Sequence, residues 1–160
     1  MKVKNFIAII LVLCLFGTIT ASATNDTVID NDGEIVYLSD GSYIVTTLDV
    51  YVVECQARST SYQKVASKTK TNYDSNGNLI WKYTLTGTFT VNEGASAVCT
   101  YAAYSIAIEN DEWSFSNGAT SWEGNVGYGK GLFQKKFLFV TTQSVEIDIS
   151  ITCDAYGNIS

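Results

Sequence analysis

Residues 79–92, with the sequence LIWKYTLTGTFTVN, alternate between apolar and polar side chains over almost their whole length. The large apolar side chains share one parity: Leu79, Trp81, Tyr83, Leu85, Phe89 and Val91. A period of two is what a half-buried antiparallel strand requires, because successive side chains point to opposite faces of a sheet. Gly87 falls on the apolar parity, where a bulge or bend suits so long a strand. The stretch therefore predicts a long strand with one buried face.

A second clear alternation ends the chain. Aliphatic residues and one cysteine share a parity in residues 145–153: Val145, Ile147, Ile149, Ile151 and Cys153. Strand-like sequence also covers residues 35–38, 43–53 and 97–108, and turn signals such as Asp40-Gly41 and Asn76-Gly77 lie between such runs. No stretch keeps a helical period. We expect an all-β single domain over residues 35–160, an antiparallel β-sandwich or a barrel-like variant of it.

The remaining stretches are expected to be less regular. Residues 56–66 are polar and predict a loop, with a short strand at residues 68–73. Residues 109–130 are rich in glycine and predict loops, and Gly127-Tyr128-Gly129-Lys130-Gly131 is interpreted as a flexible connection. It lacks the following serine or threonine of a phosphate-binding loop. Residues 132–142 predict one strand.

The amino terminus has the pattern of a secretory leader. Lys2 and Lys4 precede an unbroken apolar run over residues 6–16, and Ala21-Ser22-Ala23 follows with small side chains. This order predicts a signal peptide over residues 1–23, cleaved after Ala23, and a secreted, extracellular protein. The apolar run is too short for a membrane span, which needs about 20 residues. Residues 24–34 are polar and acidic and predict a flexible tail.

Composition limits the partners. Without the leader, 137 residues remain, enough for one domain with a core. They carry eight basic and sixteen acidic side chains, a net charge of −8. Because such a surface repels polyanions, nucleic acid and an anionic membrane are not expected partners of the mature form. An extracellular glycan or protein remains open.

Several stretches resemble a group of small secreted proteins of Gram-positive bacteria that have no assigned activity. The similarity lies in residues 36–46, in Leu85–Thr90 followed by Cys99-Thr100, in Ile151-Thr152-Cys153 and in residues 157–160. It covers residue 35 to the end. The resemblance implies a secreted β-sandwich and carries over no catalytic residue.

The mature chain keeps three cysteines, Cys55, Cys99 and Cys153, which allow one disulfide and one free thiol. Oxidising surroundings outside the cell let a disulfide persist. Sequence alone leaves the pairing open. We expect Cys99–Cys153, because both cysteines lie in strand-like segments of the second half and Cys55 borders a polar loop. The relatives share this pair, whereas Cys55 departs from their pattern.

The chemistry of the side chains argues against an enzyme. The chain has no histidine, which removes the usual general base, the common zinc ligand and every Ser-His or Cys-His pair. Glu146 and Asp148 lie two apart on one strand face and are expected to be a solvated face. Asp74, Asn76 and Asn78 lack the glycine and glutamate that complete a calcium loop. No cofactor and no metal are expected.

Two tryptophans are the candidate ligand-binding residues. Trp113 and Trp122 lie in the glycine-rich region near acidic residues, and exposed aromatic rings on a sandwich can stack on sugars. The alternative for both is core packing, which is also expected for Trp81. The principal interpretation is a non-enzymatic extracellular binding or structural domain. A carbohydrate-binding module and a secreted bacteriocin-like toxin are alternatives, the first depending on whether Trp113 and Trp122 share one exposed surface.

Overall fold

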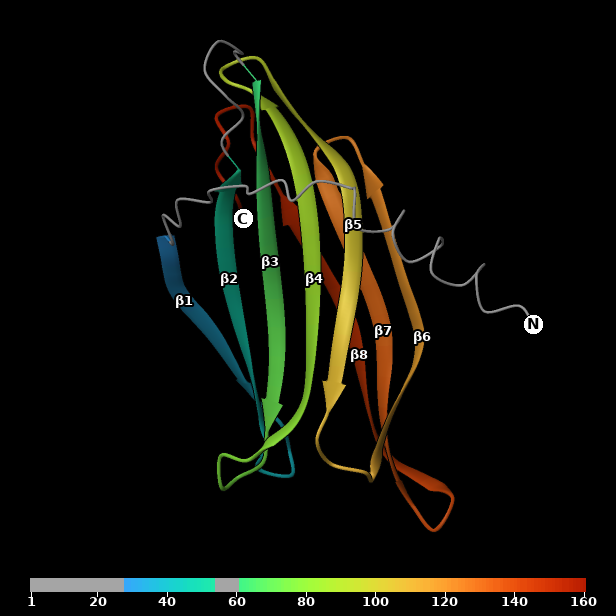
Figure 1. Cartoon of the computed structure of the whole chain (residues 1–160). Helices are drawn as coiled ribbons and strands as arrows, with labels where there is room; N and C mark the ends of the chain where they lie inside the picture. Colours follow the sequence, from blue (N-terminus) through green and yellow to red (C-terminus); the bar gives the residue numbers. More distant parts are fainter. Residues whose placement is uncertain (1–27, 54–60) are drawn as a thin grey trace, which may run out of the picture.

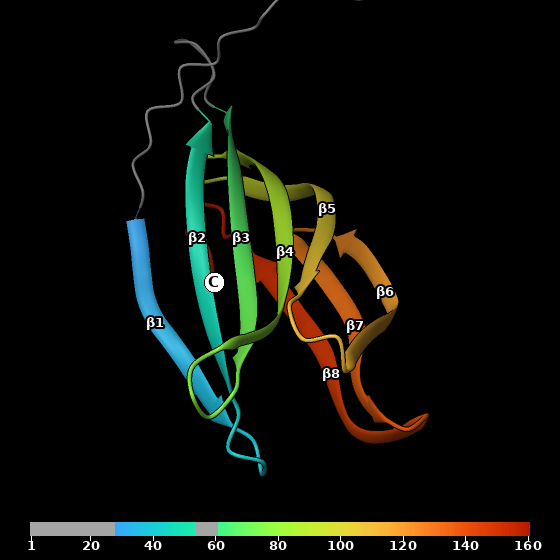
Figure 2. The ribbon, with the colours of Figure 1, turned by 60° about the horizontal axis from the view of Figure 1, so that its bottom comes forward.

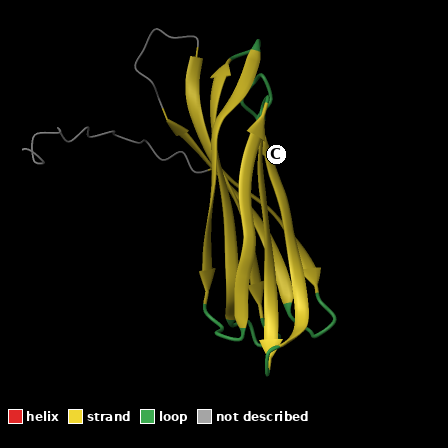
Figure 3. Cartoon of the chain, turned by 90° about the vertical axis from the view of Figure 1, so that its right-hand side faces the viewer, coloured by secondary structure: helices red, strands yellow, loops and turns green. Residues whose placement is uncertain are grey.

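The computed structural model describes residues 28–53 and 61–160, and in this part the chain forms eight strands without a helix (Figures 1 and 3). The strands are β1 (Val28–Tyr37), β2 (Tyr43–Val53), β3 (Ser61–Tyr73), β4 (Leu79–Asn92), β5 (Ser96–Ile108), β6 (Trp113–Glu123), β7 (Val126–Phe137) and β8 (Val140–Thr152). The predicted leader, residues 1–23, and Cys55 lie outside the described residues.

The strands form two antiparallel sheets whose order follows the sequence. One sheet has the order β1-β2-β3-β4-β5 and the other β6-β7-β8. The chain passes from the first sheet to the second between β5 and β6, so these edge strands lie next to each other (Figure 2). β7 and β8 also contact the first sheet. The predicted all-β, sandwich-like fold is confirmed.

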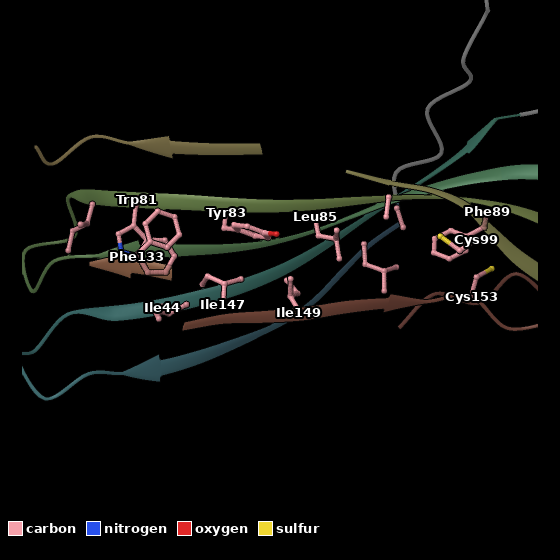
Figure 4. Packing of buried hydrophobic residues seen from close by; sticks show 14 of the residues in the cluster. Ile44, Trp81, Tyr83, Leu85, Phe89, Cys99, Phe133, Ile147, Ile149 and Cys153 are labelled. Atoms are coloured by element: carbon pink, nitrogen blue, oxygen red, sulfur yellow. The ribbon is translucent and has the colours of Figure 1, made fainter. Parts of the chain in front are cut away.

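The core forms where the inner faces of β4 and β8 meet. The inward parity of β4 is buried from Trp81 to Val91, as its alternation predicts, and Figure 4 shows Tyr83 and Leu85 facing Ile147 and Ile149 of β8. The opposite parity of β4 is stabilised by hydroxyl pairs across β3 and β4, with Thr69 bonded to Thr84 at 3.0 Å and Ser67 to Thr86 at 2.9 Å. Apolar burial on one face and hydroxyl pairing on the other therefore fix the register.

The glycine-rich stretch 127–131 is a strand, which corrects its prediction as a flexible connection. In β7 three alternate glycines face the core, Gly127, Gly129 and Gly131, and they pair with Ile151, Ile149 and Ile147 of β8. A Cβ atom at Gly129 would lie 2.6 Å from the Tyr83 hydroxyl, and one at Gly131 would collide with the Phe115 ring. Gly129 and Gly131 therefore leave space for aromatic rings in the core, whereas Gly127 lies against Cys99 and Ala102.

Four further boundaries differ from the prediction. β6, Trp113–Glu123, lies within the expected loops 109–130. The expected tail over residues 24–34 is part of β1 from Val28 onward, because its backbone pairs with β2. β3 begins at Ser61, inside the expected loop 56–66. The single strand expected over residues 132–142 is the end of β7, a two-residue turn at Leu138 and Phe139, and the start of β8. An apolar turn without glycine or asparagine gives no turn signal.

Candidate binding surface

Trp113 does not lie on the surface. Its side chain is 5% exposed at the start of β6, and its ring packs against that of Trp81, with 6.3 Å between centroids. The expectation that Trp113 stacks on a ligand is therefore corrected, because its side chain is buried in the core. The core prediction for Trp81 is confirmed, since it is fully buried and stacks on Phe133 at 4.0 Å.

Trp122 lies on the surface and has an aromatic neighbour from the other sheet. It is 48% exposed at the end of β6, and its ring centroid is 6.3 Å from that of Tyr101 on β5, which is 54% exposed. We call Tyr101 and Trp122 the edge pair, because β5 and β6 are the adjacent edges of the two sheets. Trp113 and Trp122 do not share a surface.

A β-bulge places Tyr101 in the edge pair. Thr88 pairs with Tyr101 and Phe89 with Cys99, so Thr100 is an extra residue on β5. An extra residue shifts the inward and outward parities, and this shift explains why the sequence of residues 97–108 shows apolar residues on both. Tyr101 could therefore not be identified from the alternation of the sequence. The bulge could be located only from the pairing partner of each residue, and alternation gives no information on pairing.

A chain of rings joins this edge to the core. Tyr104 on β5 stacks on buried Tyr83 with 5.5 Å between centroids and also meets Phe115, which in turn contacts Phe133. Burial raises the pKa of Tyr83 to about 12, so its hydroxyl stays protonated at neutral pH. The rings make β5 and β6 a stiff support for the edge pair.

Cys99 and Cys153 lie buried at one end of the core (Figure 4). The backbone N–H of Cys99 donates to the carbonyl of Gly124, and that of Cys153 donates to the carbonyl of the next residue, Asn125. The structure shows both as free thiols, with no disulfide among the described residues. Burial raises the pKa of both thiols. Neither is therefore activated as a thiolate nucleophile.

One cavity of the described structure is lined largely by acidic residues. It has a volume of about 520 Å³ and lies between the β3–β4 turn and the β5–β6 loop, with four carboxylates in its lining: Asp74, Glu109, Asp111 and Glu112. The Asp74 carboxylate already accepts hydrogen bonds from the backbone N–H groups of Asn76 and Asn78 and from the Asn78 amide. It is a turn-forming group. In the described part of the chain, no three cysteine or acidic side chains are grouped to hold a metal ion.

The outward carboxylates of β8 are exposed, as expected for a solvated strand face. Glu146 pairs with Leu132 and Asp148 with Lys130 across the sheet. Both carboxylates lie open to solvent. Among the residues described, no helix is long and apolar enough to cross a bilayer.

The chain matches no protein family model, no curated protein and no solved structure. Its function is therefore argued from its own residues, and the edge pair is the candidate binding surface.

Proposed function

We propose that this chain is a non-enzymatic binding domain that acts outside the cell. The leader pattern of residues 1–23 supports export. The absence of histidine and the raised pKa values of Cys99 and Cys153 argue against acid–base and nucleophilic catalysis. The observation that carries the proposal is the edge pair, two half-exposed aromatic rings that lie together on adjacent edge strands.

A glycan is the ligand class that this surface favours. Aromatic rings offer an apolar face to the C–H groups of a sugar, and amphipathic rings bind at low entropic cost. The acidic charge of the chain favours neutral over acidic glycans.

Tryptophan fluorescence of the folded protein tests the glycan proposal. Because Trp81 and Trp113 are buried, Trp122 is the tryptophan that a soluble glycan can quench or shift. We expect a saturable fluorescence change with a neutral glycan. Trp122→Phe should remove this change, and Tyr101→Ala should lower the affinity about tenfold through the loss of one stacking contact. Tyr156→Ala, at an exposed tyrosine of the C-terminal turn, is the control and leaves the change intact. No response across a broad glycan panel would contradict this ligand class.

We also propose that Cys99 and Cys153 form a disulfide in the exported protein. The support is their common buried position and the attachment of both backbones to the Gly124–Asn125 turn. In the reaction the two thiols lose two protons and two electrons to a disulfide-exchange oxidant, and one S–S bond forms.

Thiol titration of the unfolded secreted protein tests this pairing. Without reductant we expect one reactive thiol, that of Cys55, and three after reduction. Loss of the disulfide in Cys99→Ser or Cys153→Ser should lower the free energy of unfolding by about 2–5 kcal/mol. Cys55→Ser is the matched control with a much smaller effect. Three reactive thiols without reductant would overturn the proposal.

A further inference from the structure

The turn between β7 and β8 exposes four consecutive large apolar residues, Phe137-Leu138-Phe139-Val140, which we call the hairpin tip. Their side chains are between 63% and 101% exposed. Figures 1 and 2 show the hairpin projecting away from the sheets at the end where the β3–β4 turn and the β5–β6 loop also lie. Contiguous apolar surface of this kind marks an interaction site in a soluble protein.

The backbone of the hairpin tip is unfavourable for its residues. Leu138 has φ 47° and Phe139 has φ 70°, and Leu138 and Phe139 are the two central residues of the turn. Two positive φ angles define the turn for which Asn-Gly is preferred, since side chains with a large Cβ substituent destabilise that conformation. Backbone strain and apolar exposure coincide at the same residues. Such coincidence points to function.

The hydrogen bonding of the hairpin suits an apolar medium. Beyond a bulge at Thr142, Lys136 pairs with Thr141 and Phe137 with Val140, so paired residues reach the two turn residues. In a bilayer, backbone polar groups without partners are costly, and a tight hairpin leaves few of them. A projecting tip also enters a fluid apolar phase without a matching cavity, whereas a protein partner would need a fitted pocket.

The charge of the hairpin differs from that of the whole chain. Residues 132–145 contain Lys135 and Lys136 and no acidic residue. Lys135 is 3.3 Å from the Glu112 carboxylate, and Lys136, which is exposed, makes no salt bridge in the described part of the chain. Lysine side chains can extend from an inserted apolar segment to lipid headgroups.

Two acidic residues contact the strands of this hairpin behind its tip: Asp40 is hydrogen-bonded to the Gln143 side chain, and Glu112 lies beside Lys135. The Glu112 carbonyl accepts a hydrogen bond from the Lys136 backbone, two residues from Leu138, which corresponds to about 7 Å along a strand. Glu112 is therefore within the roughly 8 Å over which salt screens exposed charges under physiological conditions, but its carboxylate is paired with Lys135. Acidic residues farther away than this length contribute little to the field at the hairpin tip, so the net charge of the chain does not describe that field.

We propose that the hairpin tip inserts into the interface of a lipid bilayer, with Lys136 contacting anionic headgroups. The four apolar side chains supply the attraction, and the lysine selects anionic over zwitterionic lipid. This site is separate from the edge pair, so the exported domain would bind a glycan with one surface and attach to a membrane with another.

Flotation of the full mature chain with lipid vesicles tests the proposal. We expect binding to phosphatidylcholine vesicles that contain phosphatidylglycerol, and at least tenfold weaker binding for Leu138→Asn/Phe139→Gly, which keeps the turn and removes two apolar side chains. Lys136→Gln should reduce the preference for phosphatidylglycerol. In the apolar variant Phe139→Trp, the added fluorescence should shift to shorter wavelength, and brominated lipid should quench it.

Controls separate insertion from general adhesion. Tyr156→Ser removes an exposed aromatic side chain from the C-terminal turn and should float like the wild type. Equal flotation with and without phosphatidylglycerol would overturn the role of Lys136. Absence of flotation, or flotation that Leu138→Asn/Phe139→Gly leaves intact, would overturn insertion. A dimer that depends on the hairpin tip and forms without vesicle binding would overturn it in favour of a second copy of the chain.

Discussion

Two kinds of turn in this molecule contain residues at positive φ, and they differ in which residues occupy these positions. The β3–β4 turn and the C-terminal turn place a glycine at their positive φ, Gly77 at 84° and Gly157 at 80°. In both, an aspartate accepts hydrogen bonds from the two backbone N–H groups that lie two and four residues later, and from an asparagine amide. The β7–β8 turn instead places Leu138 and Phe139 at positive φ.

The difference separates turns that stabilise the fold from one that does not. At Gly77 and Gly157, sequence, backbone angle and hydrogen bonding agree. At Leu138 and Phe139 each positive φ costs about 1–2 kcal/mol, and the side chains remain in water. The turn of aspartate and glycine is more favourable and occurs at both Gly77 and Gly157, so the apolar residues of the hairpin tip are maintained for a reason other than stability. Membrane insertion is the reason that we propose.

Among the turns, the largest effect is expected at Gly157. A Cβ atom there would meet an unfavourable φ and would collide with the Tyr62 hydroxyl of β3. Lys64 also donates a hydrogen bond to the Gly157 carbonyl, so the turn is docked on β3 and cannot move away freely. Gly157→Ala should lower the free energy of unfolding by about 3 kcal/mol, measured by urea denaturation.

Gly77→Ala is the matched control for this prediction. Its φ is nearly the same, but the nearest atom to the added Cβ would be the Tyr43 hydroxyl at 3.8 Å. Only the conformational cost remains, about 1–2 kcal/mol. Equal losses in the two variants would show that docking of the C-terminal turn on β3 contributes nothing.

An opposite sign is expected at the hairpin tip. Leu138→Asn/Phe139→Gly supplies the residues that the turn conformation prefers and should raise the free energy of unfolding by about 1–2 kcal/mol. Urea denaturation checks the value, with the slope of the transition unchanged. A loss of stability in this variant would mean that the apolar side chains stabilise the fold, and the contrast between the two kinds of turn would disappear.

The fold could be predicted where one face of a strand is exposed to solvent and the other is buried. The alternation in β4 and β8 located both strands and their buried parity correctly. It failed in β7, because Gly129 and Gly131 occupy positions where Tyr83 and Phe115 need the space, whereas a sequence rich in glycine predicts a loop. It failed again at Leu138 and Phe139, because turn recognition depends on the polar and glycine residues that this turn lacks.

The candidate site was predictable in part. Trp122 was identified, whereas Trp113, in a similar sequence context, is a core residue. Nine residues apart, they would lie on opposite faces of a regular strand. The irregularity between Ser116 and Ala119 returns both to the parity that faces the core. Only their positions at opposite ends of β6 separate buried Trp113 from exposed Trp122. Tyr101 was missed because of the bulge in β5. Bulges are determined by pairing between strands, and a single sequence does not record pairing.

The smallest expected effect is a dependence of stability on acidic pH, which the aspartate turns have and the hairpin tip lacks. Hydrogen bonds from the Asn158 side chain and backbone hold the pKa of Asp154 below its ordinary value of 3.8, and Asn78 does the same for Asp74. Because the folded-state pKa is lower than the unfolded one, this stabilisation is present above the unfolded value and is lost as the pH falls through the folded value. Thermal unfolding from pH 7 to about pH 3 should therefore show a steeper acid loss for the wild type than for Asp154→Asn. The variant Leu138→Asn/Phe139→Gly changes no titratable group, so its melting temperature should follow the wild-type pH profile at a constant offset. Parallel profiles for Asp154→Asn and the wild type below pH 4 would mean that the aspartate turns derive their stability from glycine alone.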